Sequence, residues 1–196
     1  MGILEVFRAN PIVAAVRDVT HLDDALAAPA AAIFMLTGEL LTLRTVVQEA
    51  RAAGKPIFFH LDLVRGLSSD KAGIDYLSQE VKPDGVITTK GHVVELARNS
   101  GLITIQRIFA LDSLAVQTGI SLVKQTRPDF VEILPGIVPR VIPFVVRETR
   151  VPVIAGGLIH TRDDIDAILS AGAVAISASK REVWYMNYAR PGYSSL

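Results

Sequence analysis

The sequence predicts a compact α/β protein, a (β/α)8 TIM-like barrel of parallel strands, and three observations favour this fold class. Short apolar runs recur along the chain of 196 residues, and segments with spaced apolar residues separate them. Strict alternation of strand and helix indicates a parallel sheet covered by helices. Eight such units close best as a barrel, for which this length is the lower edge of a range centred on ~250 residues. Some helices are therefore expected to be short.

The individual elements follow from the same pattern. The expected strands are the runs 12–16, 31–36, 56–61, 85–88, 102–108, 129–134, 151–154 and 173–176. The expected helices are the segments 19–28, 41–53, 70–81, 91–100, 112–126, 138–148 and 161–171. Thr20, Asp70, Asp112 and Thr161 are expected to cap four of these helices, because their side-chain oxygens accept hydrogen bonds from free N–H groups. Pro143 lacks an N–H group, so the helix at 138–148 is expected to kink or to start late.

Composition limits the classes of function. We expect one domain over 1–186 and a frayed tail over 187–196, since no linker divides the chain and its end is rich in glycine, proline and serine. Twenty basic and twenty acidic residues cancel, so any contact with a polyanion needs a local basic patch. Cysteine is absent, which excludes disulfides and thiolate metal sites. Glu5 and Arg8 interrupt the first apolar segment, and no run approaches the ~18 residues of a membrane span, so we expect a cytoplasmic protein without membrane contact.

The stretch 151–180 carries the clearest candidate site. Gly156 and Gly157 end the seventh strand, and Ser177 and Ser179 end the eighth. In barrels of this class the loops after strands 7 and 8 often hold a phosphate, and exposed N–H groups and hydroxyls suit an anion. The sequence therefore predicts a phosphate site here. The alternative is that both motifs are only tight turns beside closely packed strands.

Polar residues at other strand ends extend this candidate site. His60 and Asp62 are two residues apart, so both can face one side and hold hydroxyl groups of a small ligand, or serve as a core histidine and a turn cap. Lys90 follows Thr88 and Thr89 ahead of a helix, where it would neutralise a phosphate or remain solvated. No metal-ligand spacing occurs among the four histidines.

Two charges lie within apolar strands. Glu132 must be paired if it is buried, and Arg107 on the neighbouring strand is its expected partner, either beside a ligand or in a purely structural role. Arg17, at the end of the first strand, faces either the ligand or the solvent.

A convincing catalytic set is absent from the sequence. No lysine lies within an expected strand, where a Schiff-base enzyme of this fold would hold it. An acid/base phosphosugar isomerase or aldolase-like enzyme remains the alternative, with Glu132 or Asp62 as base and His60 as acid.

An ordered set of motifs resembles a known family. The segments are HLD at 60–62, TTK at 88–90, QRIFALDS at 106–113, ILPG at 133–136 and AGGLI at 155–159, and the likeness covers nearly the whole chain. Together they resemble the glycerol-3-phosphate-responsive antiterminator family of bacteria. The resemblance implies a (β/α)8-like barrel without enzyme activity, which binds glycerol 3-phosphate as effector, needs no cofactor and acts on the leader mRNA of glycerol-utilisation genes to prevent premature termination.

The ligand and the RNA that the resemblance implies can be assigned to residues already singled out by their positions and charges. The phosphate would lie on Gly156, Gly157, Ser177 and Ser179 with Lys90, aided by Lys180, and the glycerol part would face His60, Asp62, Arg107 and Glu132. RNA contact would come from the nearest basic cluster in sequence, Arg140, Arg147 and Arg150, with Lys124 and Arg127 one unit earlier. A homo-oligomer is compatible with the sequence.

Overall fold

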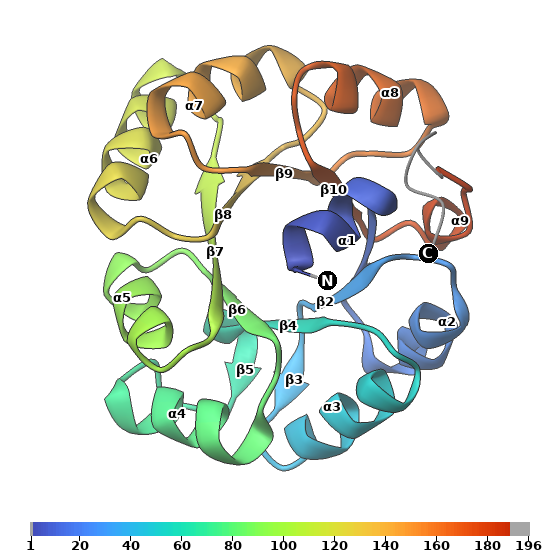
Figure 1. The fold of residues 1–196 in the computed structure, drawn as a ribbon, viewed down its shortest axis with the longest axis vertical. Coiled ribbons are helices and arrows are strands. Elements are labelled where there is room, and N and C mark those ends of the chain that lie inside the picture. Colours follow the sequence, from blue (N-terminus) through green and yellow to red (C-terminus); the bar gives the residue numbers. More distant parts are fainter. Residues whose placement is uncertain (1, 189–196) are drawn as a thin grey trace.

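A computed structural model describes residues 2–188 of the chain as a closed barrel of parallel strands surrounded by helices (Figure 1). The strands of the barrel are β1 (Ile12–Val16), β2 (Ala32–Met35), β4 (Ile57–His60), β6 (Gly85–Thr88), β7 (Ile103–Phe109), β8 (Phe130–Leu134), β9 (Val153–Gly156) and β10 (Ala175–Ala178). Their order around the barrel is β1-β10-β9-β8-β7-β6-β4-β2, and every neighbouring pair is parallel. The predicted fold class and its eight strands are confirmed.

Helices cover the outside of the ring of strands. The α-helices are α1 (Ile3–Ala9), α2 (Leu22–Ala27), α3 (Leu43–Ala52), α4 (Lys71–Tyr76), α5 (Gly91–Asn99), α6 (Ser113–Thr126), α7 (Ile142–Thr149), α8 (Arg162–Ser170) and α9 (Arg181–Trp184). Shorter turns are η1 (Val19–His21), η2 (Leu61–Leu63), the π-helical η3 (Leu77–Val81) and η4 (Pro139–Val141).

The helix boundaries largely follow the expected capping residues. Asp70, Asp112 and Thr161 are N-caps whose side chains accept the predicted hydrogen bonds. The expectation for Thr20 was wrong, because Asp18 is the N-cap of η1 and accepts a 2.9 Å hydrogen bond from the Thr20 amide. Pro143 lies in the first turn of α7, after η4, which confirms the late start of that helix.

The first helix was not predicted, and it closes the amino-terminal end of the barrel (Figure 1). Phe7 is fully buried in the apolar interior, and its ring lies 5.4 Å from that of Phe130 and 6.4 Å from that of Phe58. The interior cluster continues through Phe34 and Ile105. This end of the barrel is therefore a packed apolar plug, which leaves the opposite end for polar chemistry.

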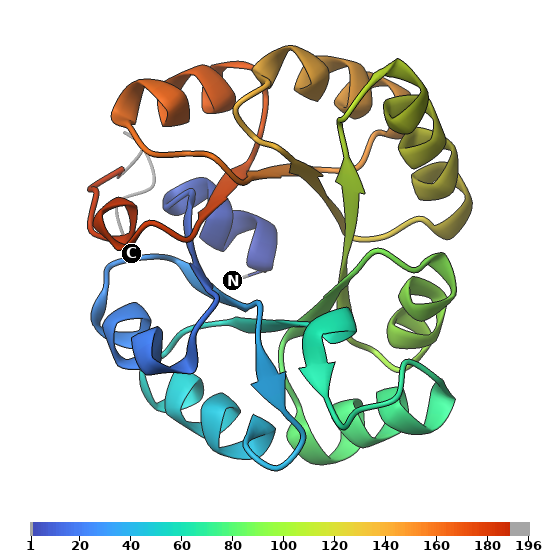
Figure 2. The ribbon, with the colours of Figure 1, turned by 180° about the vertical axis from the view of Figure 1, so that it is seen from behind.

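Three further elements were also missed, namely two short strands and α9. The two-residue strands β3 (Gly38–Glu39) and β5 (Val64–Arg65) pair in parallel as a separate small sheet, visible as the light-blue and teal arrows in Figure 2. Helix α9 follows the last strand, and the Trp184 indole N–H donates to the Ala178 carbonyl at 2.6 Å.

The predicted frayed tail starts at residue 187, and most of it, 189–196, lies outside the described residues. Within the described part, the Tyr188 hydroxyl lies 3.0 Å from both the Arg162 carbonyl oxygen and the Asp166 carboxylate.

Candidate functional site

The polar site grows directly out of the apolar interior of the barrel. On four strands the inward-facing side chain changes from apolar to polar two residues further on, which is the period of a strand. These changes are Phe58 to His60, Ile105 to Arg107, Phe130 to Glu132 and Ala175 to Ser177. All four polar residues are nearly inaccessible to solvent. A buried polar layer therefore lies above the apolar plug at the carboxyl ends of the strands.

Arg107, Glu132 and Ser177 form the centre of this layer. The Arg107 Nε donates to Glu132 Oε2 at 2.7 Å, and the Ser177 hydroxyl donates to Glu132 Oε1 at 2.6 Å. Arg107 and Glu132 are directly paired in the ladder between β7 and β8, so the register itself brings them together. The predicted ion pair is confirmed. The Ser177 hydroxyl is already engaged by the carboxylate, so its role as a phosphate ligand stays a prediction.

The close packing of this cluster requires glycine at position 156. A Cβ atom at this position would lie 2.7 Å from Glu132 Oε1 and also against the Ser177 hydroxyl. Only glycine lets the β9 backbone pass so close to the buried carboxylate.

His60 is a neutral, poorly paired group beside the cluster. Burial and the charge of Arg107 lower the pKa of His60 to about 4, although Asp62 and Glu132 act in the opposite direction. Among the described residues its Nδ1 has no hydrogen-bond partner, since Asp62 Oδ2 lies 4.0 Å away. A buried polar atom of this kind is suited to a ligand hydroxyl.

Asp62 is held by the end of β6. Its carboxylate accepts hydrogen bonds of 3.1 Å from the Thr88 hydroxyl and 2.9 Å from both the Thr89 amide and the Thr89 hydroxyl. Burial raises the pKa of Asp62, but these hydrogen bonds outweigh burial and leave the pKa below its usual value. The Lys90 ammonium lies 3.5 Å from Asp62 Oδ1 and 3.3 Å from the Ser69 hydroxyl. Lys90 therefore pairs with Asp62, and its part in phosphate binding stays a prediction.

A pocket of about 410 Å³ opens beside the ends of β9, β10 and β1. It is lined by Arg17, Phe109, Leu134, Pro135, Gly157, Leu158, Ile159, His160, Ala178, Ser179 and Lys180. Gly157 and Ser179 of the predicted phosphate site thus share one pocket with two cations, whereas Lys90 is not part of its lining. Gly157 has a φ of +84° and is followed by Leu158 at +61°, so the turn depends on glycine for its backbone conformation.

The loop after β8 is hydrogen-bonded to this glycine turn. The Gly136 amide donates to the carbonyl oxygen of Gly156 at 2.5 Å and to that of Gly157 at 3.2 Å. A Cβ on Gly136 would come within 3.0 Å of the Gly156 nitrogen. The loops after β8 and β9 therefore fit together backbone to backbone.

Phe109 lies between two cavities at the end of the barrel formed by the carboxyl ends of the strands. Its ring lines the 410 Å³ pocket and also a second cavity of about 480 Å³, which includes Thr89 and Arg107. Four residues that line the pocket were not predicted as site residues, namely Phe109, Leu134, Pro135 and Leu158. Phe109 could have been predicted, because it lies two residues after Arg107 on the same strand and so faces the same side. The positions of the other three residues depend on how the loops pack, which the sequence pattern does not reveal.

The predicted RNA-contact arginines lie outside this site, around α7. Arg140 lines a groove between α6 and α7. The Arg147 guanidinium lies 5.2 Å from the centroid of the Phe144 ring and its Nε lies 3.4 Å from Glu148. Arg150 is the exposed C-cap of α7, and Arg127 the C-cap of α6. Lys124 is paired with Glu148 at 3.0 Å, so it is less available to RNA.

The part of the chain over residues 2–188 has neither a membrane-spanning helix nor a cluster of metal-ligating side chains. No helix in this part of the chain is long and apolar enough to cross a membrane. The same residues contain no group of three or more histidine, cysteine, aspartate or glutamate side chains that could hold a metal ion.

The fold and the site together define a TIM barrel with a buried ionic layer and a glycine-lined pocket at the carboxyl ends of its strands. Solved structures of aldolases share this fold, for example a deoxyribose phosphate aldolase of Aeropyrum pernix with a TM-score of 0.67 and 12% identity over 94% of this chain and 92% of that one. That likeness concerns the fold alone. The chain belongs to the family described as glycerol-3-phosphate responsive antiterminators, which it matches over residues 12–184.

Individual relatives agree with this assignment. The chain is similar to the glycerol uptake operon antiterminator regulatory protein of Listeria monocytogenes, with a TM-score of 0.87 and 34% identity over 91% of this chain and 96% of that one. It is similar to a glycerol uptake operon antiterminator-related protein of Thermotoga maritima, with a TM-score of 0.78 and 33% identity over 89% and 98% of the two chains. It is also 36% identical to the Escherichia coli K12 protein YgcP, over 94% of this chain and 96% of that protein.

Proposed function

We propose that the protein is a cytoplasmic glycerol-3-phosphate sensor that binds the leader mRNA of glycerol-utilisation genes and prevents premature termination of transcription. The observation that carries this proposal is the family match over residues 12–184, which takes in every strand of the barrel. The proposal needs two sites on one molecule, one for the small effector and one for RNA.

The pocket at β9 and β10 is the effector site in this proposal. Arg17 and Lys180 supply positive charge beside the Gly157 turn and Ser179, a combination suited to a phosphate. The glycerol hydroxyls would turn toward the buried layer, where His60 Nδ1 is unpaired within the described residues and Glu132 can still accept hydrogen bonds. Lys90, which lies 3.5 Å from Asp62 and is not part of the lining of this pocket, would supply further positive charge from the end of β6.

The geometry favours a sensor over an isomerase. A general base for chemistry near pH 7 needs a pKa near that value. Hydrogen bonds from Thr88 and Thr89 keep the pKa of Asp62 below its usual range, and His60, with a pKa of about 4, is a neutral imidazole at pH 7 rather than the stronger acid imidazolium. Glu132 is tied to Arg107 and Ser177. We therefore propose that glycerol 3-phosphate is bound and released unchanged.

Gel-shift titration with the leader RNA of a glycerol operon tests the regulatory function. Glycerol 3-phosphate is expected to raise the affinity for RNA, because an effector can only act by preferring the RNA-competent state. Equal RNA binding with and without glycerol 3-phosphate, or consumption of the ligand at enzyme-like rates, would contradict the proposal.

Calorimetry with glycerol 3-phosphate tests the effector site. A Gly157→Leu variant is expected to lose binding, because its side chain enters the pocket from a backbone position with φ of +84°. Gly54→Leu is the matched control, since Gly54 also has positive φ, at +69°, but no neighbouring atom within 4 Å of a Cβ. Both variants carry a backbone strain of about 1–2 kcal/mol, so a loss confined to Gly157→Leu locates the ligand. Full binding by a folded Gly157→Leu variant would rule this placement out.

A further inference from the structure

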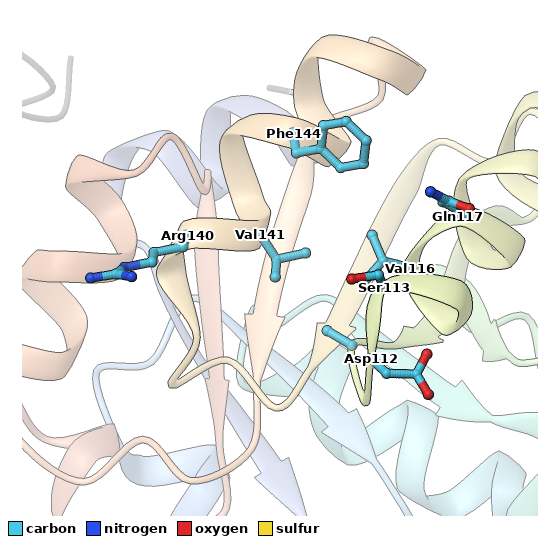
Figure 3. Close-up of a pocket in the computed structure, with 8 residues that line it drawn as sticks. Asp112, Ser113, Val116, Gln117, Arg140, Val141 and Phe144 are labelled. Atoms are coloured by element: carbon cyan, nitrogen blue, oxygen red, sulfur yellow. The ribbon is translucent and has the colours of Figure 1, made fainter.

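A groove of about 480 Å³ lies on the outer rim of the barrel, between α6 and the segment formed by η4 and α7 (Figure 3). It is lined by Ala110, Asp112, Ser113, Val116, Gln117, Arg140, Val141 and Phe144. Val116 and Val141 face each other across its floor, with Phe144 above them in the view of Figure 3. The groove thus combines an apolar slot with a polar edge.

Phe144 is an aromatic ring left at the surface. The residue is 37% exposed, and the guanidinium of Arg147 lies 5.2 Å from the centroid of its ring. The Arg147 side chain is itself 70% exposed. An exposed ring beside an arginine is well suited to stack on a flat partner that carries negative charge.

We propose that this groove binds one unpaired nucleobase of the RNA, stacked on Phe144, with Arg140 and Arg147 contacting the flanking phosphates. The inference rests on the RNA binding proposed above and deepens it by assigning the contact site. Single-stranded RNA is recognised mainly by bases that leave the strand and stack on aromatic side chains. A groove of this volume falls within the roughly 300–1,000 Å³ of small-ligand sites.

The polar edge gives the bound base an orientation. Asp112 accepts a 2.8 Å hydrogen bond from the Ala115 amide, and its carboxylate points away from the slot between Val116 and Val141 in Figure 3. The Ser113 hydroxyl points toward Val141, and this hydroxyl and the Gln117 amide can each donate and accept. A negative charge at Asp112 repels phosphate, whereas Figure 3 shows Arg140 on the far side of the groove, pointing away from Phe144. The base edge would therefore meet Ser113 and Gln117, and the sugar-phosphate chain would follow the arginines.

One short segment joins the groove to the effector pocket. Leu134 and Pro135 line the pocket, and Arg140 and Val141 line the groove only a few residues later. Between them, the Gly136 amide is hydrogen-bonded to the carbonyl oxygens of Gly156 and Gly157. A ligand that fixes the glycine turn therefore also fixes the start of η4, which is the coupling that effector-dependent RNA binding requires.

Filter-binding titrations of the leader RNA test the stacking contact. Phe144→Leu is expected to raise the Kd about tenfold to a hundredfold, as loss of one base–aromatic stack does, and Phe144→Tyr is expected to bind as the unaltered protein does. Tyr185→Leu is the control, because Tyr185, the residue after α9, is a 52% exposed ring outside the groove. Thermal unfolding of each variant verifies that the fold is retained.

The phosphate contacts are tested by salt dependence. Arg140→Ala should reduce the slope of log affinity against log salt by about 0.7 for single-stranded RNA, whereas Arg8→Ala, an exposed arginine on α1 at the other end of the barrel, should leave it unchanged. A fully paired RNA of the same length should compete weakly.

The outcomes separate the two proposals. Failure of the unaltered protein to bind leader RNA, with or without glycerol 3-phosphate, overturns the regulatory function and the groove together. RNA binding that survives Phe144→Leu unchanged overturns the groove alone. If Phe144→Leu instead alters the oligomeric state in size-exclusion chromatography while RNA affinity stays constant, the groove is a protein interface and the inference is wrong.

Discussion

Individual residues determine the chemistry at the carboxyl ends of the barrel strands. Arg107 and Glu132 were predictable as a pair, because a charge inside an apolar strand needs a partner and the two strands are adjacent. The engagement of the Ser177 hydroxyl by Glu132 was not predictable, since the contact spans 45 residues and depends on the closure of the barrel. The proximity of Lys90 to Asp62 likewise depends on the loop after β6.

Glu132→Ala is expected to destabilise the protein by about 3–5 kcal/mol, because it leaves the buried guanidinium of Arg107 without its counter-charge. Glu132→Gln should lower the stability less than Glu132→Ala does, because the amide oxygen can still accept a hydrogen bond from Arg107. Urea unfolding at pH 7 measures both values. Equal stability of Glu132→Ala and the unaltered protein would show that the pair contributes nothing to folding.

His60 should make stability depend on pH. Its pKa is about 4 in the folded protein and 6.5 when free, so the unfolded chain binds the proton first as the pH falls. The contribution of neutral His60 to the free energy of unfolding is therefore complete above pH 6.5. It is lost progressively as the pH falls toward 4, by about 3 kcal/mol in all. Unfolding free energies of the unaltered protein and of His60→Asn, measured across this window, should converge toward the acidic end. Asp62 has a lowered pKa and titrates below this window.

At the scale of elements, regular units could be predicted and short or solitary ones could not. Eight strands recur with enough apolar residues to reveal their period. In contrast, β3 and β5 have two residues each, which is too short for any periodicity. Helix α1 has seven residues, and its one fully buried side chain meets partners on β4 and β8 that are distant in sequence.

Phe7→Ala should test the plug formed by α1. Removing a fully buried ring that contacts Phe58 and Phe130 is expected to lower the free energy of unfolding by about 3–5 kcal/mol. Phe7→Leu should retain most of that stability, because it keeps much of the apolar volume. Denaturant titrations report both, and calorimetry with glycerol 3-phosphate should show unchanged affinity for each folded variant, because α1 lies at the end of the barrel away from the pocket.

For the whole molecule, the proposed sites lie on one face and share the segment from Leu134 to Val141. Thermodynamic linkage then makes the coupling reciprocal. If glycerol 3-phosphate raises the affinity for leader RNA by a given factor, saturating leader RNA should raise the affinity for glycerol 3-phosphate by the same factor. Isothermal titration of the ligand into free and RNA-bound protein measures this, and unequal factors would show that a further binding event is involved.

The position of α1 also determines where the protein can be joined to a surface or to a fusion partner without covering its binding face. This helix leads into β1 from the amino-terminal end of the barrel, while the pocket and the groove open at the opposite end. A flexible linker joined ahead of α1 therefore leaves the binding face unobstructed. Immobilised through that linker on a sensor chip, or fused there to a fluorescent reporter, the barrel would present both its effector pocket and its RNA groove to the solution.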